Sequence, residues 1–157
     1  MVDVLDQIGD DCRITEVLAP LLQETADAVL AFQDPATGCW WHVLDAPGRP
    51  GNYLEASGTA FLAFALMKGA RLGLLSPAVG RSGMRGYRGL RRFLRRDASG
   101  VWHLDGGNRV AGLGGTPYRD GSFGYYVSER PVSDDPKALA GWIRAGVEAE
   151  RAGFQEA

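Results

Sequence analysis

A few side chains in this sequence have chemistry suited to a ligand, and each also has an ordinary structural explanation. Trp41 and His42 offer a flat apolar face with a polar edge, which suits stacking on a ligand and equally suits a packed core. Arg119, beside Asp120 in a glycine-rich loop, could pair with a ligand carboxylate or with a carboxylate of the loop. Tyr125 has a tyrosine neighbour in a predicted extended segment, so one ring should face a cleft and the other the core.

Three further polar residues, Tyr53, Glu55 and Ser57, directly precede a long apolar segment. Glu55 and Ser57 could bind ligand hydroxyl groups, although Ser57 could instead serve only as a helix N-cap. A helix N-terminus stabilises a carboxylate in its charged form, which is the wrong direction for a proton donor at neutral pH. We therefore expect Glu55 to bind a ligand and not to act as a catalytic acid.

Two strongly patterned helices should position these residues. From Thr15 to about Gln33, apolar residues recur every three or four positions; Thr15 suits the N-cap, and Pro20 indicates that the regular helix starts a turn later. Residues 57–73 are apolar around the whole helix, so neighbouring elements should bury this segment on all sides. Its glycines and alanines should let neighbouring helices approach closely.

Two more helices are predicted further along the chain. Asp135 suits the N-cap and Pro136 the first position of a last helix that runs to about Ala152. Residues 83–96 have an apolar stripe and a separate basic face, which fits a nucleic-acid surface or a solvated outer helix. The net charge of -2 and the absence of interleaved aromatic residues favour the solvated helix. The basic face consists of Arg81, Arg85, Arg88, Arg92 and Arg95.

Short extended segments and a long glycine-rich loop separate the helices. Residues 39–44 and 101–104 are aromatic and β-branched, and residues 105–124 form a loop of the length that is usually functional. The loop glycines lack the spacing of a nucleotide-binding fingerprint and suit close turns. A single domain over residues 1–157, all-α and built from repeated helical hairpins, is therefore expected. A parallel sheet is the alternative, but these extended segments look too short and too aromatic for one.

Composition restricts the class of protein. With 45% hydrophobic and 23% charged residues the chain should fold, and a net charge of -2 gives no general attraction to nucleic acid. No stretch is long enough to span a bilayer, and the start has no basic segment followed by an apolar run. Cys12 and Cys39 match no zinc or redox spacing, so we expect two buried, reduced thiols in a cytoplasmic protein.

An ordered series of motifs makes a family resemblance specific. The series resembles the C-terminal half of the unsaturated rhamnogalacturonyl hydrolases, which are glycoside hydrolase family 105 and are related to the unsaturated glucuronyl hydrolases of family 88. The resemblance covers nearly the whole chain. Its motifs are Trp40-Trp41-His42-Val43-Leu44-Asp45, Gly51-Asn52-Tyr53-Leu54-Glu55-Ala56-Ser57-Gly58-Thr59-Ala60, Lys68-Gly69-Ala70-Arg71-Leu72-Gly73, Gly112-Leu113-Gly114-Gly115, Tyr118-Arg119-Asp120-Gly121-Ser122-Phe123-Gly124-Tyr125-Tyr126-Val127-Ser128-Glu129 and Asp134-Asp135-Pro136-Lys137.

The resemblance implies about half of an (α/α)6 barrel, with a cleft at one mouth. It implies carbohydrate metabolism of the pectin-degrading type, in which an oligosaccharide with an unsaturated uronic acid at its end is cleaved by hydration of the vinyl ether. It implies no metal, cofactor, nucleic acid or membrane partner. The family usually has a tyrosine–glutamine pair where this chain has Trp41-His42. The substrate-binding residues expected here are Trp41, His42, Tyr53, Glu55, Ser57, Arg119, Asp120 and Tyr125.

The resemblance also implies that a part of the family's machinery lies outside this sequence. The catalytic aspartates of the family lie in its N-terminal half, which has no counterpart here, so no catalytic residue is assigned. We expect a glycoside hydrolase fragment that is inactive alone. The alternative is a non-catalytic carbohydrate-binding or interaction fragment. A partner would be the missing N-terminal half, or a second copy bound through an exposed flank of the barrel.

Overall fold

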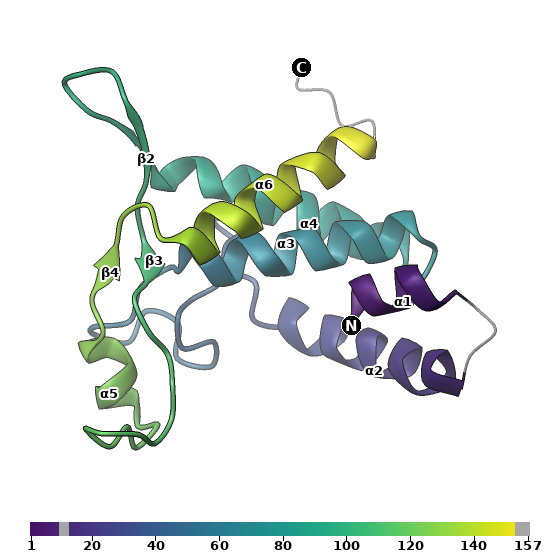
Figure 1. Cartoon of the computed structure of the whole chain (residues 1–157), viewed down its shortest axis with the longest axis horizontal. Helices are drawn as coiled ribbons and strands as arrows, with labels where there is room; N and C mark the ends of the chain where they lie inside the picture. Colours follow the sequence, from purple (N-terminus) through teal and green to yellow (C-terminus); the bar gives the residue numbers. More distant parts are fainter. Residues whose placement is uncertain (10–12, 153–157) are drawn as a thin grey trace.

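The computed structural model describes residues 1–9 and 13–152, and this part of the chain is mostly helical (Figure 1). Helices, a 3-10 turn (η1) and short strands follow one another along the chain. They are α1 (Val2–Ile8), α2 (Arg13–Leu30), α3 (Ala56–Arg71), α4 (Pro77–Gly89), η1 (Leu90–Phe93), β1 (Leu94–Arg96), β2 (Trp102–Leu104), β3 (Gly107–Asn108), α5 (Phe123–Ser128), β4 (Pro131–Val132) and α6 (Pro136–Arg151).

Helix α3 is the centre of the fold and packs against both α4 and α6 (Figure 1). Its side chains Phe64, Leu66 and Met67 are buried in the main hydrophobic cluster, which also includes residues of α1, α2, α4 and α6. The prediction that this helix is buried on all sides is wrong at Phe61, which is 40% exposed. One flank of α3 therefore has no neighbour among the described residues that covers it fully.

Small residues let the helices pack at short distances, as the sequence predicted. A Cβ atom at Gly141 of α6 would lie 2.9 Å from the Cβ of Ala60 in α3. A Cβ atom at Gly83 of α4 would lie 2.9 Å from the carbonyl oxygen of Ala63. Both distances are far below ordinary contact, so a larger residue at either glycine would push two helices apart.

The start of α2 differs from the prediction. The helix begins by Arg13 and includes Pro20, and Thr15 is therefore inside it and is not its N-cap. The Thr15 hydroxyl instead donates a hydrogen bond to the carbonyl oxygen of Gly9 (2.7 Å). The helix continues through Pro20 although proline lacks one backbone donor, because the apolar face beyond it packs against the core. Cys12 lies outside the described residues, whereas Cys39 is a buried free thiol, as predicted.

The third predicted helix is shifted. Residues 83–96 were expected to be helical, but α4 runs from Pro77 to Gly89, and after η1 the chain forms strand β1. β1 pairs with β2 in an antiparallel hairpin that aligns Leu94 with Leu104. If residues 94–96 had stayed helical, the backbone of β2 would have lacked this hydrogen-bonding partner. The apolar periodicity of residues 83–96 gives no information about such a distant partner. The only sheets in the described residues are two antiparallel pairs, so the alternative of a parallel sheet is wrong.

The two remaining helices give one correction and one confirmation. Tyr125 lies in the short helix α5 and not in an extended segment, because the Ser122 hydroxyl caps this helix by accepting from the Tyr125 N–H (3.1 Å). The cap of α6 is as predicted, since the Asp135 carboxylate accepts from the N–H of Lys137 and Pro136 is the first helical residue.

Helix α1 is tied to the centre of the fold by charge. Lys68 of α3 has a buried side chain, and its ammonium group lies 2.6 Å from a carboxylate oxygen of Asp3 and 2.8 Å from one of Asp6. Arg144 of α6 also pairs with Asp3. Three helices therefore meet at the Asp3 carboxylate. No helix in the described residues is long and apolar enough to cross a membrane.

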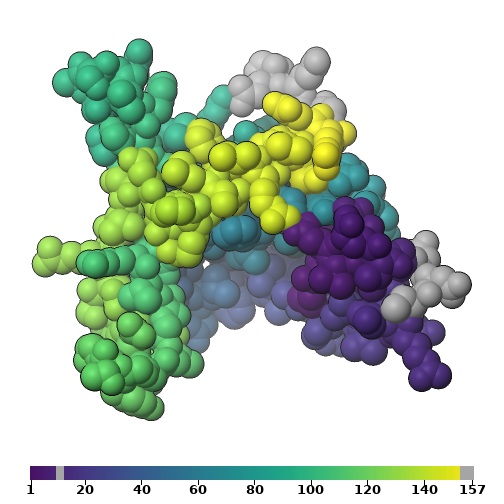
Figure 2. Space-filling model, viewed as in Figure 1, coloured from purple at the N-terminus to yellow at the C-terminus, as the bar shows by residue number. Residues whose placement is uncertain are grey.

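An apolar groove of about 330 Å³ lies where α1, α2 and α3 meet. Leu22, Ala26 and Val29 of α2 face Phe61 and Leu62 of α3 across it. In Figure 2 the surface is hollowed between the purple N-terminal helices and the green glycine-rich segment. We call the groove and the exposed Phe61 side chain beside it the apolar flank. A longer barrel or another chain could cover this surface.

Candidate functional site

Two loop regions meet at one end of the helices, on the left in Figure 1. The first connects α2 to α3, and the second connects β2 to α6. The N–H of Ala56 donates to the carbonyl oxygen of Gly106 (2.9 Å), and the N–H of Asn108 donates to the Glu55 carboxylate (2.9 Å). These bonds join the two regions at the N-terminus of α3, so their side chains can form one site.

The first loop region folds back on itself. The N–H of His42 donates to the carbonyl oxygen of Tyr53 (2.8 Å), and the N–H of Glu55 donates to that of Trp40 (2.9 Å). The Asn52 side chain closes the intervening loop through hydrogen bonds to the backbone of residues 43 and 46. This pairing brings the His42 and Tyr53 rings together.

Four aromatic rings form a continuous group, which we call the aromatic cluster: His42, Tyr53, Tyr125 and Tyr126. The His42 and Tyr53 rings are stacked, with centroids 4.9 Å apart and an interplanar angle of 11°. Tyr126 meets the His42 ring edge-on at 5.7 Å, and Tyr125 lies 5.1 Å from Tyr126. Helix α5 supplies the two tyrosines, and Arg49 of the first loop region covers the ring of Phe123 in α5 at 3.8 Å.

Burial keeps the stacked pair neutral near pH 7. Removal from water lowers the pKa of His42, although the charge of Glu55 acts in the opposite direction. Removal from water also raises the pKa of Tyr53 to about 12, with the charges of Glu55 and Glu129 adding to the effect. The two stacked rings therefore present an uncharged surface, which suits a hydroxyl-rich ligand better than an ion.

Three buried polar atoms at this end of the fold have no hydrogen-bond partner among the described residues. They are Trp41 Nε1, His42 Nε2 and Tyr125 Oη. Leaving a buried polar atom without a partner costs about 1–3 kcal/mol, so most such atoms in native proteins are paired. Trp41 Nε1 can only donate, whereas a neutral histidine and a tyrosine hydroxyl can also accept. Each of the three could therefore form a hydrogen bond with a hydroxyl group.

Glu55 is fully engaged by the protein. It is the N-cap of α3, 5% exposed, and its carboxylate accepts from the N–H groups of Ser57, Gly58 and Asn108 and from the Ser57 hydroxyl. Ser57 is therefore the second residue of the helix, and its interpretation as the N-cap is wrong. The Ser57 hydroxyl also lies 3.4 Å from the side-chain oxygen of Asn108.

Within residues 1–9 and 13–152, no hydrogen bond, ion pair or ring contact joins Arg119 or Asp120 to the aromatic cluster. The backbone of Arg119 pairs with that of Gly114, and its guanidinium lies beside Gly112 and Gly115. Arg119 forms no ion pair with another described residue, so the loop ion pair that the sequence allowed is absent there. The Asp120 carboxylate accepts from the N–H of Ser122 (2.9 Å), and this hydrogen bond lowers its pKa.

Three further residues belong to the candidate site; the sequence singled out Tyr126 as the neighbour of Tyr125, but it did not single out Asn52 or Asn108. Tyr126 provides the edge-on contact to His42, Asn52 closes the loop before Tyr53, and Asn108 joins the two loop regions at Glu55. Asn52 and Tyr126 fall inside the recognised motifs, which was the available signal, whereas Asn108 lies outside them. In the described part of the chain no group of three or more His, Cys, Asp or Glu residues could hold a metal ion.

Comparisons with known proteins show the family to which this chain belongs. Residues 1–153 match the family described as Glycosyl Hydrolase Family 88. Two curated relatives, "Protein Atu3128" of Agrobacterium fabrum and the "24.9 kDa protein in picA locus" of Rhizobium radiobacter, are each 38% identical over 156 residues. The matched region is 95% of this chain and 66% of each relative, so the chain spans just under two thirds of their length.

Solved structures show which fold the helices belong to. A glycoside hydrolase from family 105 of Clostridium acetobutylicum ("C. acetobutylicum ATCC 824") matches with a TM-score of 0.90 and 38% identity, over 96% of this chain and 42% of that chain. A family 88 glycosyl hydrolase from Bacteroides vulgatus, at 19% identity and a TM-score of 0.69, shows the same fold over 39% of its chain. The predicted partial (α/α)6 barrel is thereby confirmed. The chain belongs to Glycosyl Hydrolase Family 88, and it corresponds to part of a family 105 hydrolase structure.

Proposed function

We propose that this chain supplies part of the substrate cleft of a glycoside hydrolase that acts on unsaturated uronic-acid oligosaccharides by hydration of the vinyl ether. The observation that carries the proposal is the set of three buried, unpartnered polar atoms, at Trp41, His42 and Tyr125, beside neutral stacked rings. A sugar has an apolar face for an aromatic ring and hydroxyl groups for these atoms.

Each proposed contact residue has a role that its surroundings support. Trp41, His42, Tyr53 and Tyr125 contact the sugar directly. Arg119, which has no ion-pair partner among the described residues, pairs with the uronate carboxylate through two parallel N–H groups. Asp120 holds the turn before α5 in place through Ser122 and borders the same loop. Glu55 and Ser57 form the floor of the cleft at the N-terminus of α3.

The proton donor of the reaction is not assigned to this chain. Glu55 is the acid of the proposed cleft floor, but its oxygens accept hydrogen bonds from three backbone N–H groups. A carboxylate that is held as an acceptor on this many sides is poorly arranged to give up a proton. We therefore propose that the chain binds the unsaturated sugar and does not turn it over alone.

Binding and turnover can be measured separately on the purified chain. Titration calorimetry with an unsaturated galacturonyl disaccharide measures affinity, and loss of the double-bond absorbance measures turnover. Tyr125→Phe keeps the ring and removes one hydroxyl, so it should weaken binding about fivefold to tenfold, the value of one hydrogen bond of about 1–1.5 kcal/mol. Tyr118→Phe is the matched control, because Tyr118 is 79% exposed and its ring makes no contact with the aromatic cluster in the described part of the chain.

Two results would contradict the proposal. Equal affinity of the native chain and Tyr125→Phe would show that the unpartnered hydroxyl does not contact the sugar. A sustained loss of the double-bond absorbance that depends only on the presence of this chain would show that the chain contains its own proton donor.

A second candidate is a non-catalytic carbohydrate-binding or interaction fragment, and the apolar flank favours it. Phe61 is exposed beside the groove between α2 and α3, and apolar surface of this kind favours association. Sedimentation velocity over a range of concentrations would separate the candidates. A concentration-dependent dimer that Phe61→Ser disrupts supports association through this flank, and a monomer at all concentrations argues against it.

A further inference from the structure

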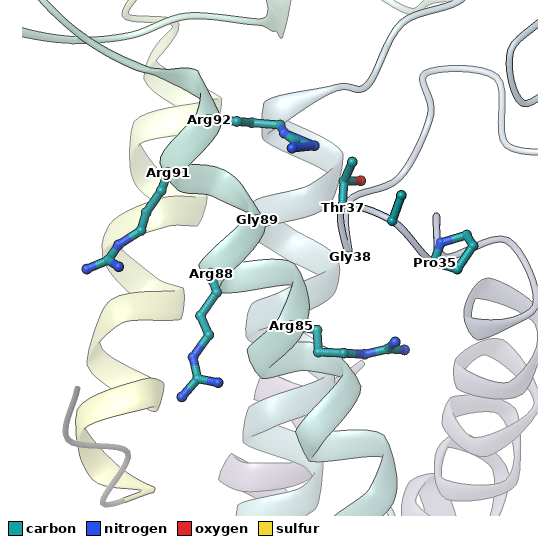
Figure 3. A pocket seen from close by; sticks show the side chains of 9 residues that line it. Pro35, Thr37, Gly38, Arg85, Arg88, Gly89, Arg91 and Arg92 are labelled. Carbon is teal, nitrogen blue, oxygen red and sulfur yellow. The ribbon is translucent and has the colours of Figure 1, made fainter. Parts of the chain in front are cut away.

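The basic face of α4 and η1 borders a pocket of about 450 Å³ (Figure 3). The pocket lies between this face and the turn at residues 35–38, which belongs to the first loop region. Arg85, Arg88 and Arg92 lie along the helical wall, and residues 35–38 form the opposite wall. Figure 3 shows Arg85 and Arg92 extending toward that turn, whereas Arg88 extends to the other side of the helix, in the same direction as Arg91. We call this pocket the arginine groove.

The wall opposite the arginines is rigid. The buried Gln33 side chain donates to the carbonyl oxygens of Gly38 (2.7 Å) and Ser82 (2.9 Å), which joins the turn to α4. A Cβ atom at Gly89 would lie 2.5 Å from the carbonyl oxygen of Thr37, so the turn and the helix are in direct contact. A groove held in this way exists before a ligand arrives, which lowers the entropic cost of binding.

Three guanidinium groups of the groove, those of Arg85, Arg88 and Arg92, have no carboxylate partner among the described residues. Arg85 donates to the neutral Gln33 side chain (2.7 Å), and no described carboxylate forms an ion pair with Arg85, Arg88 or Arg92. The nearby Asp34 carboxylate is occupied by the N–H and hydroxyl of Thr37 (2.9 and 2.6 Å). Since the chain as a whole has a net charge of -2, this concentration of guanidinium groups is a local feature with a local attraction for anions.

We propose that the arginine groove is an accessory site for an acidic oligosaccharide, with Arg85 and Arg92 binding its carboxylate groups. Guanidinium groups pair with carboxylates through two parallel hydrogen bonds, and Arg85 is already oriented by Gln33. The groove lies on the same short segment as the aromatic cluster, since the turn at residues 35–38 leads directly to Trp41 and His42. The choice of a uronate-bearing glycan rests on the proposed function.

The lining of the groove favours a glycan over a nucleic acid. Proteins that bind single strands use aromatic rings as stacking platforms for the bases, and the residues that line this groove include no aromatic side chain. The wall of proline, alanine, threonine and glycine residues leaves room for a sugar ring without offering a base-stacking surface.

The test is a titration of the whole chain with trigalacturonate at low ionic strength. The double variant Arg85→Gln/Arg92→Gln should bind about threefold to thirtyfold more weakly, the value of two exposed ion pairs. Arg85→Lys/Arg92→Lys keeps the charge but loses the paired donors, and its affinity should fall between those of the native chain and the double glutamine variant. Arg13→Gln removes an exposed arginine on α2 and should leave the affinity unchanged. All these side chains are exposed, so the variants should fold, which circular dichroism verifies.

Three outcomes would overturn the inference. The first is equal affinity of the native chain and the double glutamine variant. The second is equal affinity for trigalacturonate and for neutral maltotriose, and the third is tighter binding of a trinucleotide than of trigalacturonate. Failure of the proposed function looks different: there Tyr125→Phe has no effect on the unsaturated disaccharide, while the arginine variants still lose affinity for trigalacturonate.

Discussion

Replacement of Glu55 by alanine should destabilise the whole fold, because this side chain caps the central helix α3 and joins it to a distant loop. Its carboxylate accepts from the backbone N–H groups of Ser57 (2.9 Å), Gly58 and Asn108 (2.9 Å) and from the Ser57 hydroxyl (2.7 Å). With Glu55 only 5% exposed, water has little access to these donors in the native structure. Glu55→Ala therefore leaves three backbone donors without a partner.

The magnitude follows from that number of donors. A buried donor without a partner costs about 1–3 kcal/mol, and some relaxation toward water is expected, so we estimate about 3–6 kcal/mol for Glu55→Ala. Domains of this size have a total free energy of unfolding of about 5–15 kcal/mol, so the variant should lose a large fraction of its stability. Glu55→Gln keeps one acceptor oxygen and should cost about 1–3 kcal/mol, since one donor would face the new amide NH₂.

The assay is urea denaturation followed by the helical circular dichroism signal. The expected order of destabilisation is Glu55→Ala, then Glu55→Gln, then Ser57→Ala, which removes only one hydroxyl donor and serves as the control for local packing. If Glu55→Ala and Ser57→Ala cost the same, the three backbone donors are not held by this carboxylate and the argument is refuted. A loss of sugar affinity in Ser57→Ala with unchanged stability would instead support a direct contact with the ligand.

The remaining predictions concern packing and pH. Gly86→Leu should lower the melting temperature, because even a Cβ atom at Gly86 would lie 2.7 Å from the ring of Trp40, which is 1% exposed; unchanged melting would mean that the ring can move aside. His103 lies between the carboxylates of Asp97 (3.1 Å) and Asp134 (2.7 Å), which raise the pKa of the histidine, while their hydrogen bonds to it help to lower their own. The stability that His103 contributes is fully present below the pKa of the histidine in the unfolded chain, and it is lost as pH rises through the higher pKa of the folded state. The stability that the two aspartates contribute is present above their pKa in the unfolded chain, and it is lost as pH falls through their lower pKa in the folded state. Urea midpoints of the native chain and His103→Gln should therefore differ most between about pH 4 and pH 6.5, and a difference that grows above pH 8 would contradict the pairing.

Local sequence determined several elements of this protein because the signals lie within a few residues of one another. The apolar periodicity before Asp34 and the small residues of α3 predicted two packed helices. The Asp135-Pro136 pair predicted the start of α6, since an N-cap and its first helical residue need no distant partner. The ordered motifs indicated the hydrolase family, which requires only the sequence itself.

Tertiary structure decided the rest, because the deciding partners are far apart in the chain. Ser57 has a better residue type for an N-cap, yet Glu55 takes that role because its carboxylate can also accept from Asn108. The segment from Leu94 continues a helical pattern but becomes a strand, because β2 offers it a backbone partner. The candidate site likewise exists only where α5 places Tyr126 against the His42 ring. A local pattern records what a segment prefers alone, and these three outcomes depend on hydrogen bonds and ring contacts that form only after distant segments meet.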